Sequence, residues 1–306
     1  MDLKQLETFV QVAELGSFTR AAAVLHVAQP ALSRQVRALE VELRQPLFDR
    51  NGRGVTLTEA GKRLLAHGRG ILAQVQRARE DLETQRGAAS GRLAIALPPS
   101  VSRTLTGPLV AAFREQFPQA TLSLVEGLST YALEWLALGR VDMAVVYNMT
   151  PGPTVQLQPV LEEALYLVSA RQAGGGTGGS GSVGRPVTLA QVAALPLVMP
   201  NRPHSIRMLV ESTLAGAALQ PRIALEIDSV PAILDLVERQ HLHAVLSLNA
   251  LRGRELAFTA RPVALGRGKA PLAARLWLAT SAQRPGTPLM AQGQALVAQM
   301  LHRHLV

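Results

Sequence analysis

The chain has 306 residues, 48% of them hydrophobic, which is enough for two ordinary domains with buried cores. No apolar run reaches the roughly 20 residues of a membrane-spanning helix, and Asp2 and Glu7 stand where a secretory signal would be positive and then apolar. We therefore expect a cytoplasmic protein without a membrane segment. The absence of cysteine excludes disulfides, thiolate nucleophiles and cysteine zinc sites.

The net charge of +9 favours a polyanionic partner such as nucleic acid, although charge alone does not define a fold. Residues 17 to 69 hold nine Lys and Arg against four Asp and Glu. Contacts to nucleic acid are therefore expected first in this segment.

Three helices and a hairpin are predicted for residues 1 to 58. Ser17 can cap the second helix, the third begins at Gln29-Pro30, and two short β-like runs flank the turn dipeptide Asn51-Gly52. This order predicts a winged helix-turn-helix domain. The apolar positions, at spacings of three and four, are Leu3, Leu6, Val10 and Ala13, then Phe18, Ala21, Ala22 and Leu25, then Leu32, Val36, Leu39 and Leu43.

Residues 59 to 89 continue as one long helix that begins at the cap Thr58 and the first-turn acid Glu59. A helix about 40 Å long cannot bury its apolar seam within so small a domain, so we expect it to pair with a second copy. The alternative is a long helix packed on its own core. The seam consists of Leu64, Ile71, Val75, Ala78 and Leu82.

Residues 90 to 306 follow the small-residue segment "GAASG" and alternate short apolar β runs with amphipathic segments, which predicts parallel sheets covered by helices. The alternation repeats after residue 186. We expect an α/β region of two subdomains, one of about 90–161 and 266–306 and the other of about 162–265. A ligand cleft between them would lie beyond the carboxyl ends of the strands.

The glycine-rich segment 173–184 is predicted to be a flexible surface loop. Gly174, Gly176 and Gly179 match G-x-G-x-x-G, but no helix follows to receive phosphates, and Pro186 comes next. The chain also has no Walker lysine and no Gly-x-Ser-x-Gly elbow. The pairs His241-x-His243 and His302-x-His304 have no third ligand near by in sequence. We expect no metal, no cofactor and no catalytic centre.

The third predicted helix keeps Pro30, Ser33, Arg34 and Arg37 on the face opposite its apolar stripe. Proline at the first helical position costs nothing, and the remaining free N–H groups and the helix dipole suit a phosphate. Gln29 can pair bidentately with adenine, and either arginine with guanine. The alternative is a solvated face with incidental arginines.

The segment "GSFTRAAAVLHVAQPALSRQVRALEVELRQPLFDRNGRGVTLTEAG" resembles the amino-terminal signature of LysR-type transcriptional regulators, most closely the nitrogen-assimilation-control branch. The later order of elements also resembles that family, with "GRVDMAVV" at 139–146 the best later match. The matching positions are Ala21-Ala22, Leu25, Gln29-Pro30-Ala31-Leu32-Ser33, Leu39-Glu40, Leu43, Leu47-Phe48, Arg50, Thr58 and Ala60-Gly61.

The resemblance implies base contacts in the major groove from Gln29, Pro30, Ser33 and Arg34, and a minor-groove contact from Arg53 of the wing. It implies phosphate contacts from Arg37, Arg50, Ser17 and Thr19. It also implies dimers through the linker helix and usually tetramers, binding to interrupted palindromes near promoters, contact with RNA polymerase and a small-molecule effector.

Two departures from the family pattern bear on these expectations. Gln45 stands where the family commonly has glycine, before the wing. Gln240, Leu242 and Ser247 replace a Gly-x-Gly turn and a proline, which puts that rim of the ligand cleft in question.

Three polar loops that follow predicted strands supply candidates for the effector cleft, and their chemistry suits a small carboxylate or polar metabolite. Arg202 would serve as the counter-ion of an anion. Ordinary helix capping explains Ser100, Ser102, Ser129 and Ser205 equally well. The candidates are Ser100, Val101, Ser102, Ser129, Asn201, Arg202 and His204.

Two other functions compete with a regulator of transcription. One is a two-lobed α/β enzyme that uses the helical unit as a nucleic-acid anchor, but no paired carboxylates or nucleophile and base occur at a diagnostic spacing. The other is a nonspecific chromosomal DNA-binding protein, whose binding would be nearly independent of sequence and would fall steeply with salt.

Overall fold

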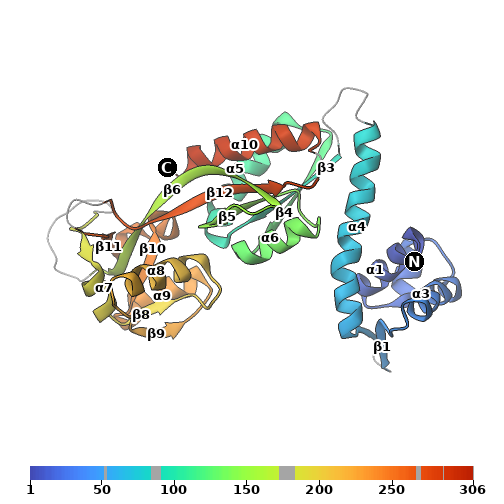
Figure 1. Ribbon diagram of the computed structural model, residues 1–306, viewed down its shortest axis with the longest axis horizontal. Helices are drawn as coiled ribbons and strands as arrows, with labels where there is room; N and C mark the ends of the chain where they lie inside the picture. Colours follow the sequence, from blue (N-terminus) through green and yellow to red (C-terminus); the bar gives the residue numbers. More distant parts are fainter. Residues whose placement is uncertain (52–53, 84–90, 172–182, 267–269, 285, 306) are drawn as a thin grey trace.

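The computed structural model describes residues 1–51, 54–83, 91–171, 183–266, 270–284 and 286–305. Figure 1 shows a small helical unit at one end, a single long helix beside it, and a larger two-part α/β region on the other side of that helix. The predicted loop 173–184 lies outside the described residues apart from Val183 and Gly184.

The amino-terminal unit is a winged helix-turn-helix built on one apolar core. Val36 and Leu39 of the third helix are fully buried in one core with Phe9 of the first. Leu43, which was predicted to be the last member of this apolar stripe, is 36% exposed and lies outside the core. Glycine at position 16 has φ +59° and ends the first helix in the left-handed conformation. The elements are α1 (Leu3–Leu15), α2 (Phe18–Val24), α3 (Gln29–Leu43) and the antiparallel strands β1 (Phe48–Asn51) and β2 (Gly54–Leu57).

Helix α4 (Glu59–Glu83) has 25 residues and is about 37 Å long. The hydroxyl of Thr58 accepts the Gly61 N–H at 3.0 Å, as expected for the cap of this helix. Arg69 forms an ion pair with Glu14 of α1 at 2.8 Å, so the first half of α4 packs on the winged-helix unit.

The first subdomain has a parallel core of three strands covered by helices. Strand β3 (Gly91–Leu97) pairs with β4 (Ala120–Glu126) and β5 (Met143–Tyr147). The helices are α5 (Pro99–Gln116), α6 (Ser129–Ala137) and α10 (Pro288–Leu305). All five side chains of β5 are buried, because helices cover the sheet on both faces.

Two long antiparallel strands join the subdomains, and periodicity did not predict them. Strand β6 (Val155–Ala170) pairs with β12 (Ala273–Ser281) over its first part. Over its last part it pairs with β10 (His243–Ser247) and β11 (Phe258–Ala264). The sheet is therefore mixed, and β6 is shared by both subdomains, as Figure 1 shows.

The second subdomain repeats the arrangement of strands and helices on a smaller scale. Strand β8 (Leu197–Met199) pairs in parallel with β9 (Ile223–Glu226) and β10 (His243–Ser247). The remaining elements are β7 (Val187–Thr188), α7 (Leu189–Ala194), α8 (Ser205–Gly216), α9 (Val230–Gln240), β11 (Phe258–Ala264) and the 3₁₀ turns η2 (Leu248–Leu251) and η3 (Glu255–Ala257). Among the described residues, no helix is both long enough and apolar enough to span a bilayer.

Candidate nucleic-acid interface and ligand cleft

The N-terminus of α3 is open. The helix begins at Gln29, and its N-cap is Ala28, whose side chain accepts no hydrogen bond. Pro30 was predicted to be the first helical residue, but it is the second. Pro30 has no N–H group to leave unpaired, and the N–H groups of Ala31 and Leu32 donate to the Ala28 carbonyl oxygen at 2.9 and 3.2 Å. The N–H of Gln29 has no intrahelical partner, because it belongs to the first turn. An uncapped helix start of this kind suits a phosphate.

The outward face of α3 is polar and accessible. Gln29, Pro30, Arg34 and Arg37 are exposed and Ser33 is half-buried. No hydrogen bond or ion pair to either arginine occurs within the described part of the chain. In Figure 1 this helix lies on the side of the winged-helix unit that faces away from the α/β region.

Ser17 caps α2, as predicted, because its hydroxyl oxygen accepts the Arg20 N–H at 3.3 Å. That oxygen is thereby occupied, while the hydroxyl proton can still donate to a phosphate. Thr19 is exposed in the first turn of the same helix. Their phosphate contacts stay a prediction.

Glu40 fixes the base of the wing, a role that the sequence patterns did not show. One carboxylate oxygen accepts the N–H groups of Leu47 and Phe48, at 2.8 and 3.2 Å. The left-handed residue before the wing is Arg44, with φ 53°, so Gln45 does not have to adopt the conformation that glycine favours. Arg53 and the side chain of Arg50 lie outside the described residues.

The predicted seam of α4 divides into two parts. Leu64 is half-buried and packs against the core of its own winged-helix unit, and its part in a dimer seam stays a prediction. Ile71 is 39% exposed, Ala78 is exposed and Val75 is half-buried. The side chain of Leu82 lies outside the described residues.

A cleft lies between the two subdomains, with about 640 Å³ of space between its walls when the open solvent at its mouth is counted. Of the seven predicted effector residues, Ser100, Ser129 and His204 line it. The rim at residues 239–251 also forms without the family's glycines, because His241 takes the left-handed conformation, with φ 53°. Ser247 and Ala250 line the cavity.

The other four predicted residues do not line the cleft. Val101 is fully buried in the core, and the Ser102 hydroxyl lies 3.2 Å from that of Thr106 on α5. The structure does not support these two assignments, because Val101 is packed in the core and Ser102 is engaged along its own helix.

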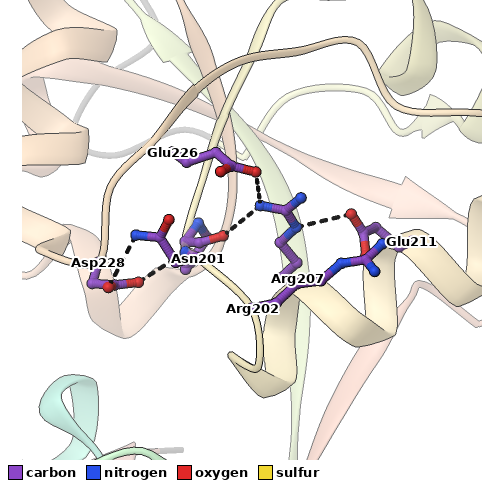
Figure 2. A network of polar contacts seen from close by, with 7 residues as sticks. Asn201, Arg202, Arg207, Glu211, Glu226 and Asp228 are labelled. Carbon is purple, nitrogen blue, oxygen red and sulfur yellow. Dashed lines mark hydrogen bonds and ion pairs between the residues drawn. The ribbon is translucent and has the colours of Figure 1, made fainter.

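Arg202 and Asn201 are engaged elsewhere, as Figure 2 shows. Arg202 forms an ion pair with Glu211 at 2.8 Å, is 65% exposed and does not line the cavity, so its predicted role as counter-ion of an anion has no support from its position. Asn201 donates its backbone N–H and its side-chain amide to Asp228, at 2.8 and 3.0 Å. Asp228, rather than Asn201, lines the cavity.

A buried polar network that sequence reasoning missed forms part of the cavity wall. The Tyr147 hydroxyl donates to Glu163 Oε2 at 2.7 Å, and the Asn249 amide donates to Glu163 Oε1 at 2.5 Å. Burial, together with the adjacent carboxylate of Glu163, raises the pKa of Tyr147 well above its ordinary value, so the phenol remains a donor. The network joins β5 and β6 to η2.

Capping does not explain the predicted serines. The N-caps of α5, α6 and α8 are Pro98, Leu128 and His204, and the first two have no side-chain cap. Ser100 and Ser129 therefore sit inside the first turns of their helices, facing the cavity.

A basic winged helix-turn-helix joined by a long helix to a two-lobed domain with a polar cleft defines a ligand-responsive DNA-binding regulator. Residues 3–62 match the family model "Bacterial regulatory helix-turn-helix protein, lysR family", and residues 86–301 match "LysR substrate binding domain". The chain belongs to the LysR family. It is a transcriptional regulator with an effector-binding domain and not an enzyme.

Named relatives and solved structures agree. The chain is 37% identical to the nitrogen assimilation regulatory protein nac of Klebsiella aerogenes over 76% of this chain and 74% of that protein, and 35% identical to that of Escherichia coli K12 over 82% and 80%. It is also similar to full-length CbnR complexed with its target DNA, at 25% identity and TM-score 0.70, over 98% of this chain and 100% of the other.

Proposed function

We propose that this regulator reads its operator through the outward face of α3, with base contacts from Gln29, Pro30, Ser33 and Arg34. The observation that carries the proposal is the exposed polar face above a buried Leu32, Val36 and Leu39 stripe, at an uncapped helix start. Helices that read DNA in this fold place such residues against base edges in the major groove.

The phosphate contacts would surround this face. They come from Arg37 on α3, Ser17 and Thr19 at the start of α2, and Arg50 at the wing, with Arg53 reaching the minor groove. Backbone contacts of this kind set register and orientation on the duplex and carry no direct sequence information.

Replacing Arg34 by alanine tests base reading. We expect affinity for the cognate site to fall about 5- to 150-fold, the loss of one bidentate base contact, with a smaller effect on random DNA. Arg37→Ala should weaken both DNAs equally and lower the salt slope by about 1. Arg114→Ala, exposed on α5, is the matched control. Equal losses on cognate and random DNA for Arg34→Ala would disprove the base-reading role; titration by fluorescence anisotropy measures both.

The proposed effector is a small molecule, not a resident cofactor, bound in the cleft between the subdomains. The place of the cleft between the subdomains and the polar groups in its wall support it. A ligand that binds only the folded protein stabilises it, so effector binding should raise the melting temperature. We further propose that the chain acts in the cytoplasm as a dimer or tetramer at interrupted palindromes and contacts RNA polymerase there. The similar regulator CbnR has a crystal structure in complex with its target DNA.

A further inference from the structure

The charge of the cleft is opposite to the one that its loops led us to expect. The only charged side chains among its described lining are two carboxylates, Glu163 and Asp228. Glu163 is 6% exposed. The lining also contains two other titratable side chains, Tyr147 and His204. Burial lowers the pKa of His204 in spite of the nearby Asp228. A ligand that presents only anionic groups would meet negative charge here.

The arginines near the cleft are already engaged. Arg207 is held by Glu211 at 2.8 Å and Glu226 at 2.5 Å, and Arg202 by Glu211. Arg103 donates to the carbonyl oxygens of Asn249 and Ala250. Within the described residues no lysine or arginine pairs with Glu163 or Asp228.

Each carboxylate retains acceptor capacity. Glu163 accepts one bond at each oxygen, from Tyr147 and Asn249, and Asp228 accepts one at each oxygen from Asn201. A carboxylate can accept about four hydrogen bonds, so a ligand donor with a positive charge finds both charge and free lone pairs.

The cavity also offers hydrogen-bond donors for a negatively charged ligand group, at the starts of two helices. The N-termini of α5 and α6 line the cavity, and neither has a side-chain cap. Ser129 is 6% exposed, its oxygen accepts the Tyr147 N–H at 3.0 Å, and its hydroxyl proton has no acceptor among the described residues. Free N–H groups and a spare hydroxyl donor suit a ligand carboxylate.

Leu128, Ile206, Val230 and Leu246 provide apolar wall around these polar groups. We propose that the effector is a small zwitterion of the α-amino acid type, with its ammonium group at Glu163 and Asp228 and its carboxylate at the starts of α5 and α6. The proposal rests on the proposed effector site and specifies the chemistry that it recognises.

The full chain can be tested by thermal shift and titration calorimetry with each of the twenty L-amino acids, and separately with dicarboxylates and sugars. For every amino acid that raises the Tm, the amine lacking its carboxylate and the acid lacking its amine are tested too. We expect one or a few amino acids to bind and both truncated compounds to bind at least about tenfold more weakly.

Glu163→Gln should weaken binding about 10- to 100-fold, since a charge-assisted hydrogen bond becomes a neutral one. Glu162→Gln is the matched control, because Glu162 is the adjacent residue, exposed and paired with Arg275 outside the cleft. Asp228→Asn provides a second test should Glu163→Gln fail to fold.

Binding of the deaminated acids as tightly as the amino acids would overturn the zwitterion assignment and leave the effector site standing. So would binding by dicarboxylates or sugars alone. No shift with any compound in either set would overturn the effector proposal itself.

Discussion

His204 has two roles at the rim of the cleft. Its Nδ1 accepts the Ile206 N–H at 3.2 Å and so caps α8, and its ring lines the cavity. Because Nδ1 is an acceptor, the ring must be neutral, and burial lowers its pKa from the ordinary value of 6.5. The cap therefore depends on pH.

We predict that acid destabilises the fold through His204. The folded pKa is depressed, so below about pH 6.5 the unfolded chain takes up a proton that the folded chain refuses, and stability falls until the lowered folded pKa is reached. His204→Asn retains a good cap but has no titrating ring. Urea unfolding should therefore show a smaller loss in the free energy of unfolding between pH 7.5 and 5.5 for this variant than for the unaltered chain. His243, whose pKa burial also lowers, leaves a residual slope.

The exposed His302→Asn is the control and should leave the slope unchanged. An identical slope in His204→Asn and in the unaltered chain would mean that the cap is not the titrating group.

Sequence predicted which side chains of α3 are exposed better than it predicted which side chains line the cleft, for a physical reason. Around α3, helical periodicity alone divides buried Leu32 from exposed Arg34. The cleft combines groups from separate strands and loops, and no local pattern shows that Arg202 pairs with Glu211. The sequence did contain a signal for Glu163, because it alternates with Leu165 and Leu167 on the same buried face of β6.

At the scale of elements, the wing and the linker helix form one joint. Glu40 of α3 holds the chain that enters β1, and the Thr58 hydroxyl donates to the Pro46 carbonyl at 2.7 Å while capping α4. Gly61 completes the contact, because a Cβ there would lie 2.1 Å from the Leu47 carbonyl oxygen. The direction of the wing is thus fixed to the direction of α4.

Gly61→Ala should therefore separate the wing from α4. Because the obstacle is backbone, we expect a loss of about 1–3 kcal/mol in the free energy of unfolding, typical of overpacking, and weaker DNA binding. Gly107→Ala, in the interior of α5 with nothing within 4 Å, is the control and should be stabilising by about 0.5–1 kcal/mol. Urea titration measures the free energy of unfolding of both variants. A Gly61→Ala protein as stable as the unaltered chain would contradict the close contact between Gly61 and Leu47.

The elements of the winged-helix unit were predictable because each has its own local signal, such as the Ser17 cap and the Thr58 cap. The long strands β6 and β12 were not. They pair with each other although more than 100 residues lie between their ends, and their register Ala273↔Ala164 to Ser281↔Val155 depends on that distant partner. Mixed sheets need such non-local pairing, which periodicity does not contain.

At the scale of the whole molecule, α4 is held on both sides by its own chain. A Cβ at Gly68 would lie 3.1 Å from Leu6 and Val10 of α1, and one at Gly70 would lie 1.7 Å from the Leu138 carbonyl oxygen at the end of α6. Two small residues thus allow the linker helix to contact the winged-helix unit and the effector domain, which Figure 1 shows on either side of it.

These contacts leave Ile71, Val75 and Ala78 together on another face, at spacings of four and three. Ile71 is 39% exposed and Ala78 is exposed, although an isolated chain gains nothing by presenting them to water. We therefore predict that this part of the seam pairs with a second copy of α4.

Ile71→Asp should break that pairing. Pairing would bury two carboxylates that face each other in an apolar seam, which costs desolvation and brings like charges together. Sedimentation velocity should therefore show a shift from dimer or tetramer toward monomer at micromolar concentration. Gln76→Asp, exposed about 140° around the helix from position 71, carries the same new charge and should leave the distribution unchanged. Because α4 also contacts the effector domain, the Ile71→Asp variant is checked for folding. Its effector domain should retain the unfolding transition of the unaltered chain. An unaltered sedimentation profile would place the oligomer interface somewhere other than α4.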